Sequence, residues 1–207
     1  MNSPILAADF YNRSALIVAR DLLGMRLVRI LPDGTRIAGR IVETEAYTGL
    51  DDLASHAGRH KRTSRNLPMW KAPGRAYVYF TRGIHWMLNV VVEPEDQPAA
   101  ILIRAIEPLE GLDAIARHRP DSKPLDWTSG PARLTRALAI TGTLNEVDMT
   151  SATAGLWIEA DQAIPDSLVR TGPRIGLGKT PEPWFSIPWR WWIGGNPYVS
   201  AKSGKLG

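Results

Sequence analysis

Strand-like and helix-like runs follow one another along this chain without a regular β-α-β alternation. Runs rich in β-branched and aromatic residues, each bounded by turn residues, predict strands at 25–31, 35–47, 75–81, 86–92, 99–106, 155–159, 168–177 and 189–199. Apolar periodicity and start signals predict helices over 10–23, from Pro108 to about Arg117, and after Ser129-Gly130-Pro131. This order predicts an α+β fold with a curved, mixed or largely antiparallel sheet and flanking helices.

The 207 residues are expected to form a single domain, residues 1–207, without repeats or a linker. The first thirteen residues are predicted to be less ordered, and residues 200–207 to form a flexible tail. Residues 48–74 are polar and broken by glycine and proline, which predicts a long loop of the kind that tends to be functional. Hairpin turns are expected at Asp33-Gly34 and around Gly83.

Composition excludes several classes of chemistry. The chain has no cysteine, which rules out disulfides, thiolate zinc sites and cysteine nucleophiles. His56 lacks a second histidine at metal-ligand spacing, so we expect no metal. No apolar run has membrane-spanning length, and the first residues lack the character of a signal peptide. We therefore expect an intracellular protein, in the cytoplasm or nucleoid if bacterial, without a membrane partner.

Acidic residues are missing from one stretch, residues 53–92. Its cations are Arg59, Lys61, Arg62, Arg65, Lys71, Arg75 and Arg82. Residues 167–207 are also basic, with six cations against the single anion Glu182, whereas residues 93–166 carry thirteen anions. If the two basic segments meet in space, they form one face of the kind that binds nucleic acid. The alternative is an ordinary solvated basic surface.

Two carboxylates and an aromatic ring alternate along one predicted strand. Glu43, Glu45 and Tyr47 therefore point to the same face. An ordinary solvent face is one explanation of this pattern. The functional alternative is a carboxylate beside a ring, which can bind a planar, electron-poor group and deprotonate a nearby water. Neighbouring residues on one face cannot flank a substrate from opposite sides, which argues against a conventional pair of sugar-cleaving carboxylates.

Aromatic residues also line the predicted strand 75–81. Tyr77 and Tyr79 share a face with Thr81. Stacking on aromatic rings is how proteins hold an unpaired base, and the alternative is an aromatic sheet core. The glycines of 174–178 match no phosphate-binding pattern and indicate a tight bend. The tryptophans near the C-terminus are expected to pack in the core.

Several short motifs occur in order along nearly the whole chain from about residue 14. They are Gly39-Arg40-Ile41-Val42-Glu43-Thr44-Glu45-Ala46-Tyr47, Ala54-Ser55-His56, Pro73-Gly74 with Tyr77-Val78-Tyr79, Leu88-Asn89, the run from Ile103 to Gly111, Ser129-Gly130-Pro131, Leu138-Ala139-Ile140, Arg174-Ile175-Gly176 and the run from Gly195 to Ser200. In this order the chain resembles the alkyladenine DNA glycosylase family, the methylpurine or 3-methyladenine DNA glycosylases of base-excision repair.

The resemblance implies a role for each matching residue. Glu45 matches the general base for the attacking water, Arg104 the arginine that holds carboxylate and water, and Ile175 a position whose backbone carbonyl contacts the water. The residues matching the base pocket are Tyr47, His56 and Tyr79, which sandwich the flipped base, and Asn89, which crowds the 2-amino group of guanine. Ala100 and Leu102 match positions that line the pocket or approach the nucleotide. Expected DNA contacts are Arg82, Gly83, Tyr77, Arg59, Lys61, Arg62, Arg65, Ser129 and Gly130.

One position departs from the family pattern. The family usually has a tyrosine before the glycine of its protruding, DNA-contacting β-hairpin, and that tyrosine fills the gap left by the flipped nucleotide. This chain has Arg82 there. An arginine can enter a narrow minor groove and bind phosphate, but it is a poorer apolar plug.

The resemblance implies an enzyme that flips a damaged purine from double-stranded DNA and hydrolyses its N-glycosidic bond, leaving an abasic site. Its expected lesions are 3-methyladenine and 7-methylguanine, and also deaminated or etheno purines. No lysine falls within the matched catalytic motifs, so a monofunctional glycosylase without lyase activity is expected, acting as a monomer without cofactor or metal. The competing hypothesis is a non-catalytic module that binds damaged or distorted DNA.

Overall fold

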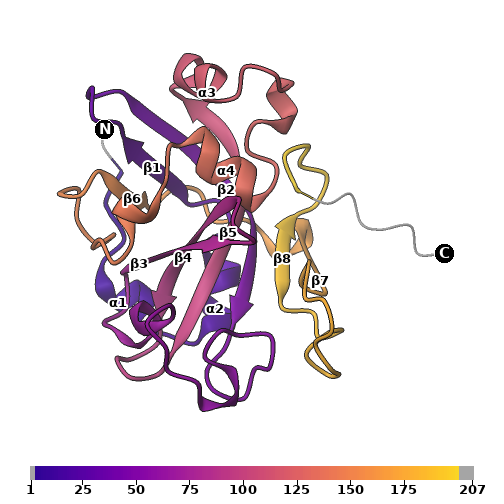
Figure 1. The fold of residues 1–207 in the computed structure, drawn as a ribbon. Coiled ribbons are helices and arrows are strands. Elements are labelled where there is room, and N and C mark those ends of the chain that lie inside the picture. Colours follow the sequence, from indigo (N-terminus) through magenta and orange to yellow (C-terminus); the bar gives the residue numbers. More distant parts are fainter. Residues whose placement is uncertain (1–2, 201–207) are drawn as a thin grey trace.

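The computed structural model describes residues 3–200 (Figure 1). Its strands are β1 (Arg26–Ile30), β2 (Arg36–Tyr47), β3 (Ala76–Thr81), β4 (His85–Val92), β5 (Ala99–Glu110), β6 (Leu156–Glu159), β7 (Val169–Gly172) and β8 (Arg190–Ile193). Its α-helices are α1 (Ala8–Tyr11), α2 (Ala15–Asp21), α3 (Leu112–His118) and α4 (Pro131–Ala137). The predicted C-terminal tail, apart from Ser200, lies outside the described residues, as do residues 1 and 2.

A sheet of eight strands forms the centre of the fold. Its main path is β3-β4-β5-β2-β1-β6, and β8 pairs with both β2 and β7. Every recorded strand pairing is antiparallel. Figure 1 shows β7 and β8 along one side of the molecule and α3 at one end, with α4 nearer the middle of the view. The predicted α+β class with a largely antiparallel sheet is confirmed.

Two of the three predicted helices were placed wrongly. The run 10–23 is two helices, because the polar segment 12–14 interrupts the backbone pattern between α1 and α2. Pro108 does not open a helix; it lies inside β5, opposite Gly39, beside a shift in strand register. A proline lacks the N–H that the sheet needs, so it is tolerated where the pairing is already irregular. The helix predicted after Ser129-Gly130-Pro131 is α4, and it begins at Pro131 as expected.

The predicted strands near the C-terminus are too long. The run 168–177 contains only β7, and the run 189–199 contains only β8. Both stretches then leave the sheet and carry Ile175 and Ser200 toward β2, as the hydrogen bonds below show. The loop 48–74 is irregular as predicted, with two short 3-10 turns, Gly58–His60 and Leu67–Trp70.

Strands β2 and β5 are paired through two irregularities that position polar side chains. Val42 on β2 and Arg104 on β5 each fall between successive paired residues. Such bulges bend a strand and redirect a side chain. On the opposite side of β2, the Thr44 hydroxyl donates to the Ala19 carbonyl of α2 at 2.7 Å. Helix α2 therefore covers one face of β2 and leaves the other to the carboxylates.

Strands β3 and β4 are joined by a short turn. Arg82 and Gly83 both have positive φ, 52° and 67°. The Ile84 N–H closes the turn onto the Thr81 carbonyl at 3.0 Å. Arg82 and Ile84 are exposed. A non-glycine residue seldom adopts positive φ, so the backbone holds Arg82 at the tip against its preference.

Candidate active site

Glu45 lies fully buried near the end of β2. Its Oε1 accepts a hydrogen bond from the backbone N–H of Ile175 at 2.6 Å and lies 3.2 Å from Arg104 Nη1. Its Oε2 accepts a hydrogen bond from the Tyr47 hydroxyl at 2.9 Å. The structure therefore brings the three residues predicted to be catalytic into direct contact, although they are far apart in sequence.

Glu43 is also fully buried, so the alternative of a solvent face for these carboxylates is wrong. Its Oε1 accepts hydrogen bonds from Arg104 Nε and Arg190 Nη1, both at 3.0 Å. Its Oε2 accepts the backbone N–H of Ser200 at 2.7 Å. Glu43 is thus an anchor for two arginines. Of the two carboxylates, Glu45 contacts the aromatic residue.

Burial raises the pKa of Glu45 above the ordinary carboxyl value. The Arg104 charge, the Ile175 N–H and the Tyr47 hydroxyl act in the opposite direction because they stabilise the ionised form. Burial and the Glu45 charge also raise the pKa of Tyr47, which keeps its hydroxyl protonated as a donor. The result is a carboxylate that is more basic than a solvated one and is held by three donors.

A cavity of about 280 Å³ opens next to Tyr47. It is lined by Tyr47, Leu53, Ala54, His56, Met69, Tyr77, Tyr79, Thr81, Arg82, Asn89, Ala100, Gly176, Leu177 and Thr180. Ligand pockets usually measure roughly 300 to 1,000 Å³, so this one has the size for a small planar group. Five of the six predicted pocket residues line it. The sixth, Leu102, is buried opposite Glu45 in the β2–β5 pairing and is not among the lining residues.

The aromatic side chains of the cavity contact one another. The His56 and Tyr79 rings lie 4.6 Å apart edge to face, and the Tyr77 and Tyr79 rings 5.2 Å apart. His56 Nδ1 lies 2.7 Å from the Tyr77 hydroxyl. Desolvation by the surrounding protein, and then the Arg65 charge, lower the pKa of His56, so its ring is neutral at pH 7.

Asn89 is held in one orientation at the base of the cavity. It is 3% exposed, and its amide Nδ2 donates to the Tyr77 carbonyl at 3.0 Å. Because this bond uses one of the two amide hydrogens, the position of the whole amide group is set by the β3 backbone. Ala100 on β5 is also buried and adds a small apolar wall.

A second hollow, of about 300 Å³, is bordered by two of the residues that contact Glu45. It is lined by Arg104, Ser129, Gly130, Pro131, Ala132, Arg133, Ile175 and Ser200. The structure thus places two of the predicted DNA contacts, Ser129 and Gly130, beside Arg104 and Ile175. Partners of Glu45 line both spaces, since Tyr47 faces the first cavity and Arg104 the second. Glu45 lies between them.

Several of the predicted DNA-binding cations lie beside the first cavity: Arg82 lines it, and Arg59 and Lys61 line a further hollow that shares His56 with it. Lys179 lines the same hollow as Arg59 and Lys61, so the two basic segments of the chain meet there. Arg62 lies over the Trp70 ring at 4.8 Å, and Arg65 over the Tyr79 ring at 4.9 Å. The tip residues Arg82 and Gly83 are exposed, whereas Tyr77 is buried and faces the cavity rather than solvent.

Sequence reasoning gave no role to Arg174, Asp52 or Arg190. Arg174 and Asp52 form a fully buried ion pair 122 residues apart in sequence, with Nη1 to Oδ2 at 2.5 Å and Nη2 to Oδ1 at 2.9 Å. Arg190 reaches Glu43 from β8. The only available signal was the position of Arg174 next to Ile175 in a family motif, because no local pattern reveals a long-range buried pair.

None of the helices within residues 3–200 has the length and apolar character needed to span a bilayer. Within the same residues, no three His, Asp or Glu side chains gather as metal ligands. What the described residues do bring together is a buried, activated carboxylate and an aromatic cavity bordered by cations. This combination defines a hydrolase-type site for a flat group carried on a polyanion.

Comparison with known proteins agrees with this class. The family model for methylpurine-DNA glycosylase matches residues 9–197. A candidate 3-methyladenine DNA glycosylase of Salinibacter ruber is 42% identical over 206 residues, covering 96% of this chain and 97% of the relative. Similarly named proteins of Chlorobium phaeobacteroides and Bacillus subtilis are each 43% identical, covering 97% and 94% of this chain and 99% and 96% of the relatives.

The chain therefore belongs to the methylpurine-DNA glycosylase family. The family that its motifs indicated is confirmed. The predicted enzyme class, a DNA glycosylase of DNA repair, is confirmed as well.

Proposed function

We propose that this enzyme flips alkylated purines, 3-methyladenine and 7-methylguanine, out of duplex DNA and hydrolyses their N-glycosidic bonds. The observation that carries the proposal is the contact between buried Glu45 and Tyr47, which joins a base-activating carboxylate to the wall of the aromatic cavity. Flipping is needed because the anomeric carbon cannot be reached in line while the nucleotide is stacked. A cavity of about 280 Å³ suits one base rather than a longer segment.

The walls of the cavity suit a cationic base. N3- and N7-alkylated purines carry positive charge, and the Tyr47 and Tyr79 rings attract a cation to their faces. The neutral state of His56 matters here, since a charged imidazole would repel such a base. With its Nδ1 engaged by Tyr77, His56 would meet the base through Nε2. The walls are therefore polar enough to orient the base and carry no full positive charge of their own, apart from Arg82 at the edge.

Glu45 acts as the general base. It removes a proton from a water that attacks the anomeric carbon, and its negative charge stabilises the oxocarbenium-like transition state. Arg104 and the Ile175 amide hold the carboxylate in one orientation. A cationic leaving base needs no further protonation, so one carboxylate is sufficient. Deaminated and etheno purines, which are neutral, would also require protonation of the leaving base and are expected to react more slowly.

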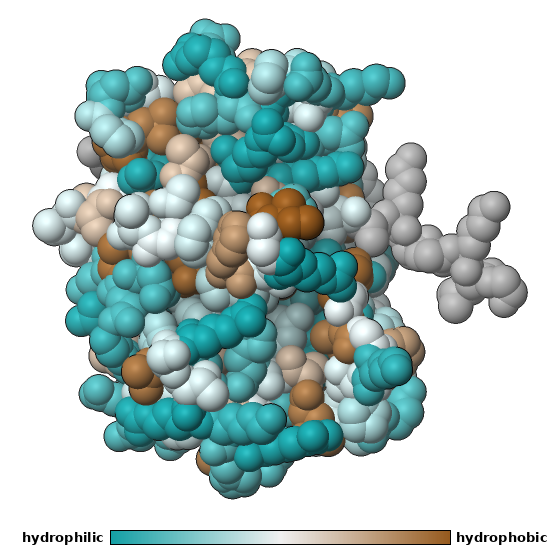
Figure 2. Space-filling model, in the orientation of Figure 1, coloured by the Kyte–Doolittle hydropathy of each residue, from teal (hydrophilic) through white to brown (hydrophobic). Residues whose placement is uncertain are grey.

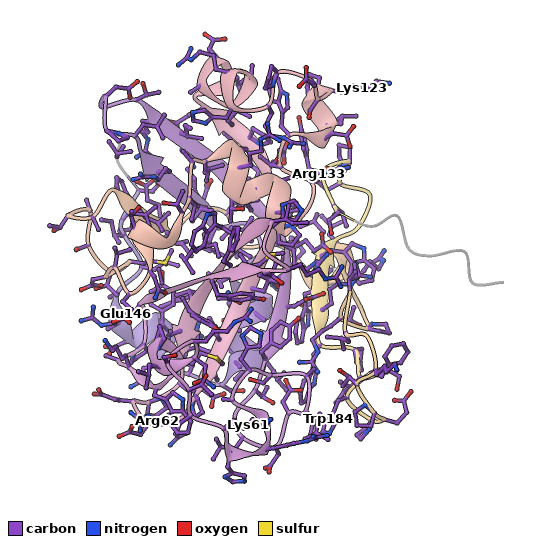
Figure 3. The ribbon with its side chains drawn as sticks, in the orientation of Figure 1. Lys61, Arg62, Lys123, Arg133, Glu146 and Trp184 are labelled. Atoms are coloured by element: carbon purple, nitrogen blue, oxygen red, sulfur yellow. The ribbon has the colours of Figure 1, made fainter. Side chains whose placement is uncertain are left out.

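DNA approaches over the face that bears the β3–β4 hairpin. Figure 3 shows Lys61 and Arg62 at the lower end of this view, and Lys123 and Arg133 in its upper half. Figure 2 shows hydrophilic residues gathered at both ends, with apolar residues between them. Beside the hairpin tip, a groove of about 720 Å³ is lined by Arg119, Arg133 and Arg136. Cations on both sides of the cavity would hold the phosphates that flank a flipped nucleotide.

No lysine is found among the residues that line the described cavity. An amine nucleophile is needed to form the Schiff base of a lyase. We therefore propose a monofunctional glycosylase, acting as a monomer, that leaves an intact abasic site.

Release of free base from methylated duplex DNA tests the proposal. We expect wild-type protein to release 3-methyladenine and 7-methylguanine, resolved by chromatography, and to leave alkali-labile abasic sites without cutting the strand. Heat-treated protein and Glu45→Gln serve as controls for spontaneous depurination. Binding to methylated duplex without base release above those controls would show a non-catalytic binding module instead.

A further inference from the structure

The Arg174 side chain is fully buried and contacts the ring of Tyr47, which bonds Glu45 and lines the base cavity. Its Nη1 donates to the Ala46 carbonyl at 3.0 Å, and its Nη2 to the Trp184 carbonyl at 3.2 Å, in addition to both oxygens of Asp52. Its guanidinium lies 4.8 Å from the centre of the Tyr47 ring and 5.1 Å from that of Trp189. One side chain thus connects four separate segments of the chain.

These contacts reach both oxygens of Glu45. Oε1 accepts the N–H of Ile175, the residue that follows Arg174 in the chain. Oε2 accepts the hydroxyl of Tyr47, whose ring contacts the Arg174 guanidinium and whose preceding carbonyl, that of Ala46, accepts from it. A shift of Arg174 would therefore move two of the donors that orient Glu45.

The partner carboxylate extends the same unit to the loop that carries His56. Asp52 Oδ2 accepts the backbone N–H of Thr48 at 3.1 Å, and Oδ1 accepts that of Ala54 at 3.0 Å. These bonds fold the chain between Tyr47 and His56 into a tight turn around the carboxylate. The two pocket residues are consequently held at a set separation by the ion pair.

We propose that Arg174, anchored by Asp52, is a positioning residue that holds Glu45, Tyr47 and the His56 loop in their reactive arrangement. The proposal rests on the function proposed above for Glu45. Arginine is required because its planar fork binds both carboxylate oxygens and presents a flat face to Tyr47 and Trp189. A lysine would supply the charge without the fork or the stacking face.

Arg174→Lys tests the proposal because it keeps the buried charge. A misplacement of about 1 Å can cost a reaction roughly a hundredfold in rate, so we expect a single-turnover excision rate about a hundredfold below wild type. Binding to duplex containing an abasic site should stay within a few-fold, since the Arg174 side chain is fully buried. Asp52→Asn, which keeps the shape and one acceptor oxygen, should show the same loss in weaker form.

Arg36→Lys is the matched control. Arg36 also binds a carboxylate with two contacts, to Glu159 Oε1 and Oε2 at 3.1 and 2.9 Å, and lies 5.7 Å from the Trp157 ring. It lies at the far end of β2, nine residues from Glu45 and on the order of 30 Å along the strand. Both Arg174→Lys and Arg36→Lys weaken an ion pair, so both variants should have a lower melting temperature. Excision at 25 °C should stay unchanged in Arg36→Lys.

A carboxyl-13C titration of the free protein separates this inference from the proposed function. The Glu45 signal is assigned by its loss in Glu45→Gln. In Arg174→Lys we expect the Glu45 titration midpoint to rise, since the Ile175 N–H and the Tyr47 hydroxyl both favour the ionised form, and to stay unchanged in Arg36→Lys. This readout stands even if wild-type protein releases no base. An unchanged Glu45 titration midpoint in folded Arg174→Lys would overturn the inference. If that variant does not fold, an unchanged Glu45 midpoint in Asp52→Asn would overturn it.

Discussion

Replacing Glu45 by glutamine isolates the chemical step from binding and folding. Glutamine keeps the shape of the side chain, and its oxygen can still accept the Ile175 N–H now found at 2.6 Å. Its amide can donate to the Tyr47 oxygen, once that hydroxyl turns away. Arg104 retains Glu43 at 3.0 Å, so its charge is not left unpaired. We therefore expect a folded protein whose DNA affinity is close to that of wild type.

The expected loss in rate is large. General-base catalysis typically contributes about a hundred- to ten-thousandfold, which corresponds to roughly 2.7 to 5.5 kcal/mol of activation free energy. The structure argues for the upper half of this range, because no second carboxylate can take over. Glu43 bonds Arg104, Arg190 and the Ser200 N–H, none of which lines the aromatic cavity, whereas Glu45 bonds Tyr47, which does. Glutamine also removes the negative charge that stabilises the transition state.

The assay is single-turnover release of 7-methylguanine from a defined duplex with enzyme in excess, beside anisotropy measurements on an abasic duplex. Glu43→Gln is the companion variant, since it removes the anchor of two arginines and should lower stability more than Glu45→Gln does. An excision rate for Glu45→Gln within a few-fold of wild type would refute the assignment. A larger loss in a folded Glu43→Gln would move the role of base to that residue.

Four further predictions concern the pH dependence, the salt dependence, Asn89 and Arg82. Burial raises the pKa of Glu45, and the proposed reaction needs its ionised form. The single-turnover rate should therefore fall as pH is lowered, with a midpoint above that of an ordinary carboxyl group. If the residual rate of Glu45→Gln falls over the same pH range, this prediction is wrong. Affinity for duplex should fall with salt, with a log–log slope of roughly −0.9 per phosphate contact, and a flat dependence would mean that the basic face does not meet DNA. The resemblance assigns to Asn89 the crowding of the 2-amino group of guanine, and its amide is held at the Tyr77 carbonyl. Asn89→Ala should therefore raise excision of normal guanine relative to 7-methylguanine, and an unchanged ratio would make Asn89 structural. Arg82→Ala should destabilise the flipped state in a 2-aminopurine fluorescence assay and Arg82→Tyr should restore it, whereas a change in salt slope alone would show a phosphate contact.

The sequence predicted the architecture well where local patterns decide the structure. The hairpin turns, the order of the strands up to β5 and the start of α4 follow from turn residues and periodicity. The errors occur where tertiary pairing overrides a local signal. Pro108 was interpreted as the start of a helix, but it lies in β5. There it pairs with Gly39 beside a shift in strand register, where a residue without an N–H is tolerated.

The site was predictable only in part, for a physical reason. Alternation placed Glu43, Glu45 and Tyr47 on one face, but it could not show that the face is buried. Burial comes from segments around Ile175 and Ser200, more than 120 residues away. Arg104 reaches both carboxylates from a register irregularity, which no periodicity reveals. Only the family resemblance predicted that Arg104 and Ile175 act together with Glu45.

Charge balance explains why so many arginines surround one catalytic carboxylate. A buried carboxylate without partners would take up a proton and lose its function as a base. Here Glu43 and Glu45 are offset by Arg104 and Arg190, and Asp52 by Arg174, so the buried groups sum to no net charge.

Neutrality serves both the fold and the reaction. With an excess of arginine, the field at the cavity would repel a cationic alkylated purine. With an excess of carboxylate, Glu45 would stay protonated. Glu43 therefore supports the proposed base, because it offsets the charge of Arg104, which also contacts Glu45. A family member that lost this glutamate would have to lose Arg190 as well to keep the same balance.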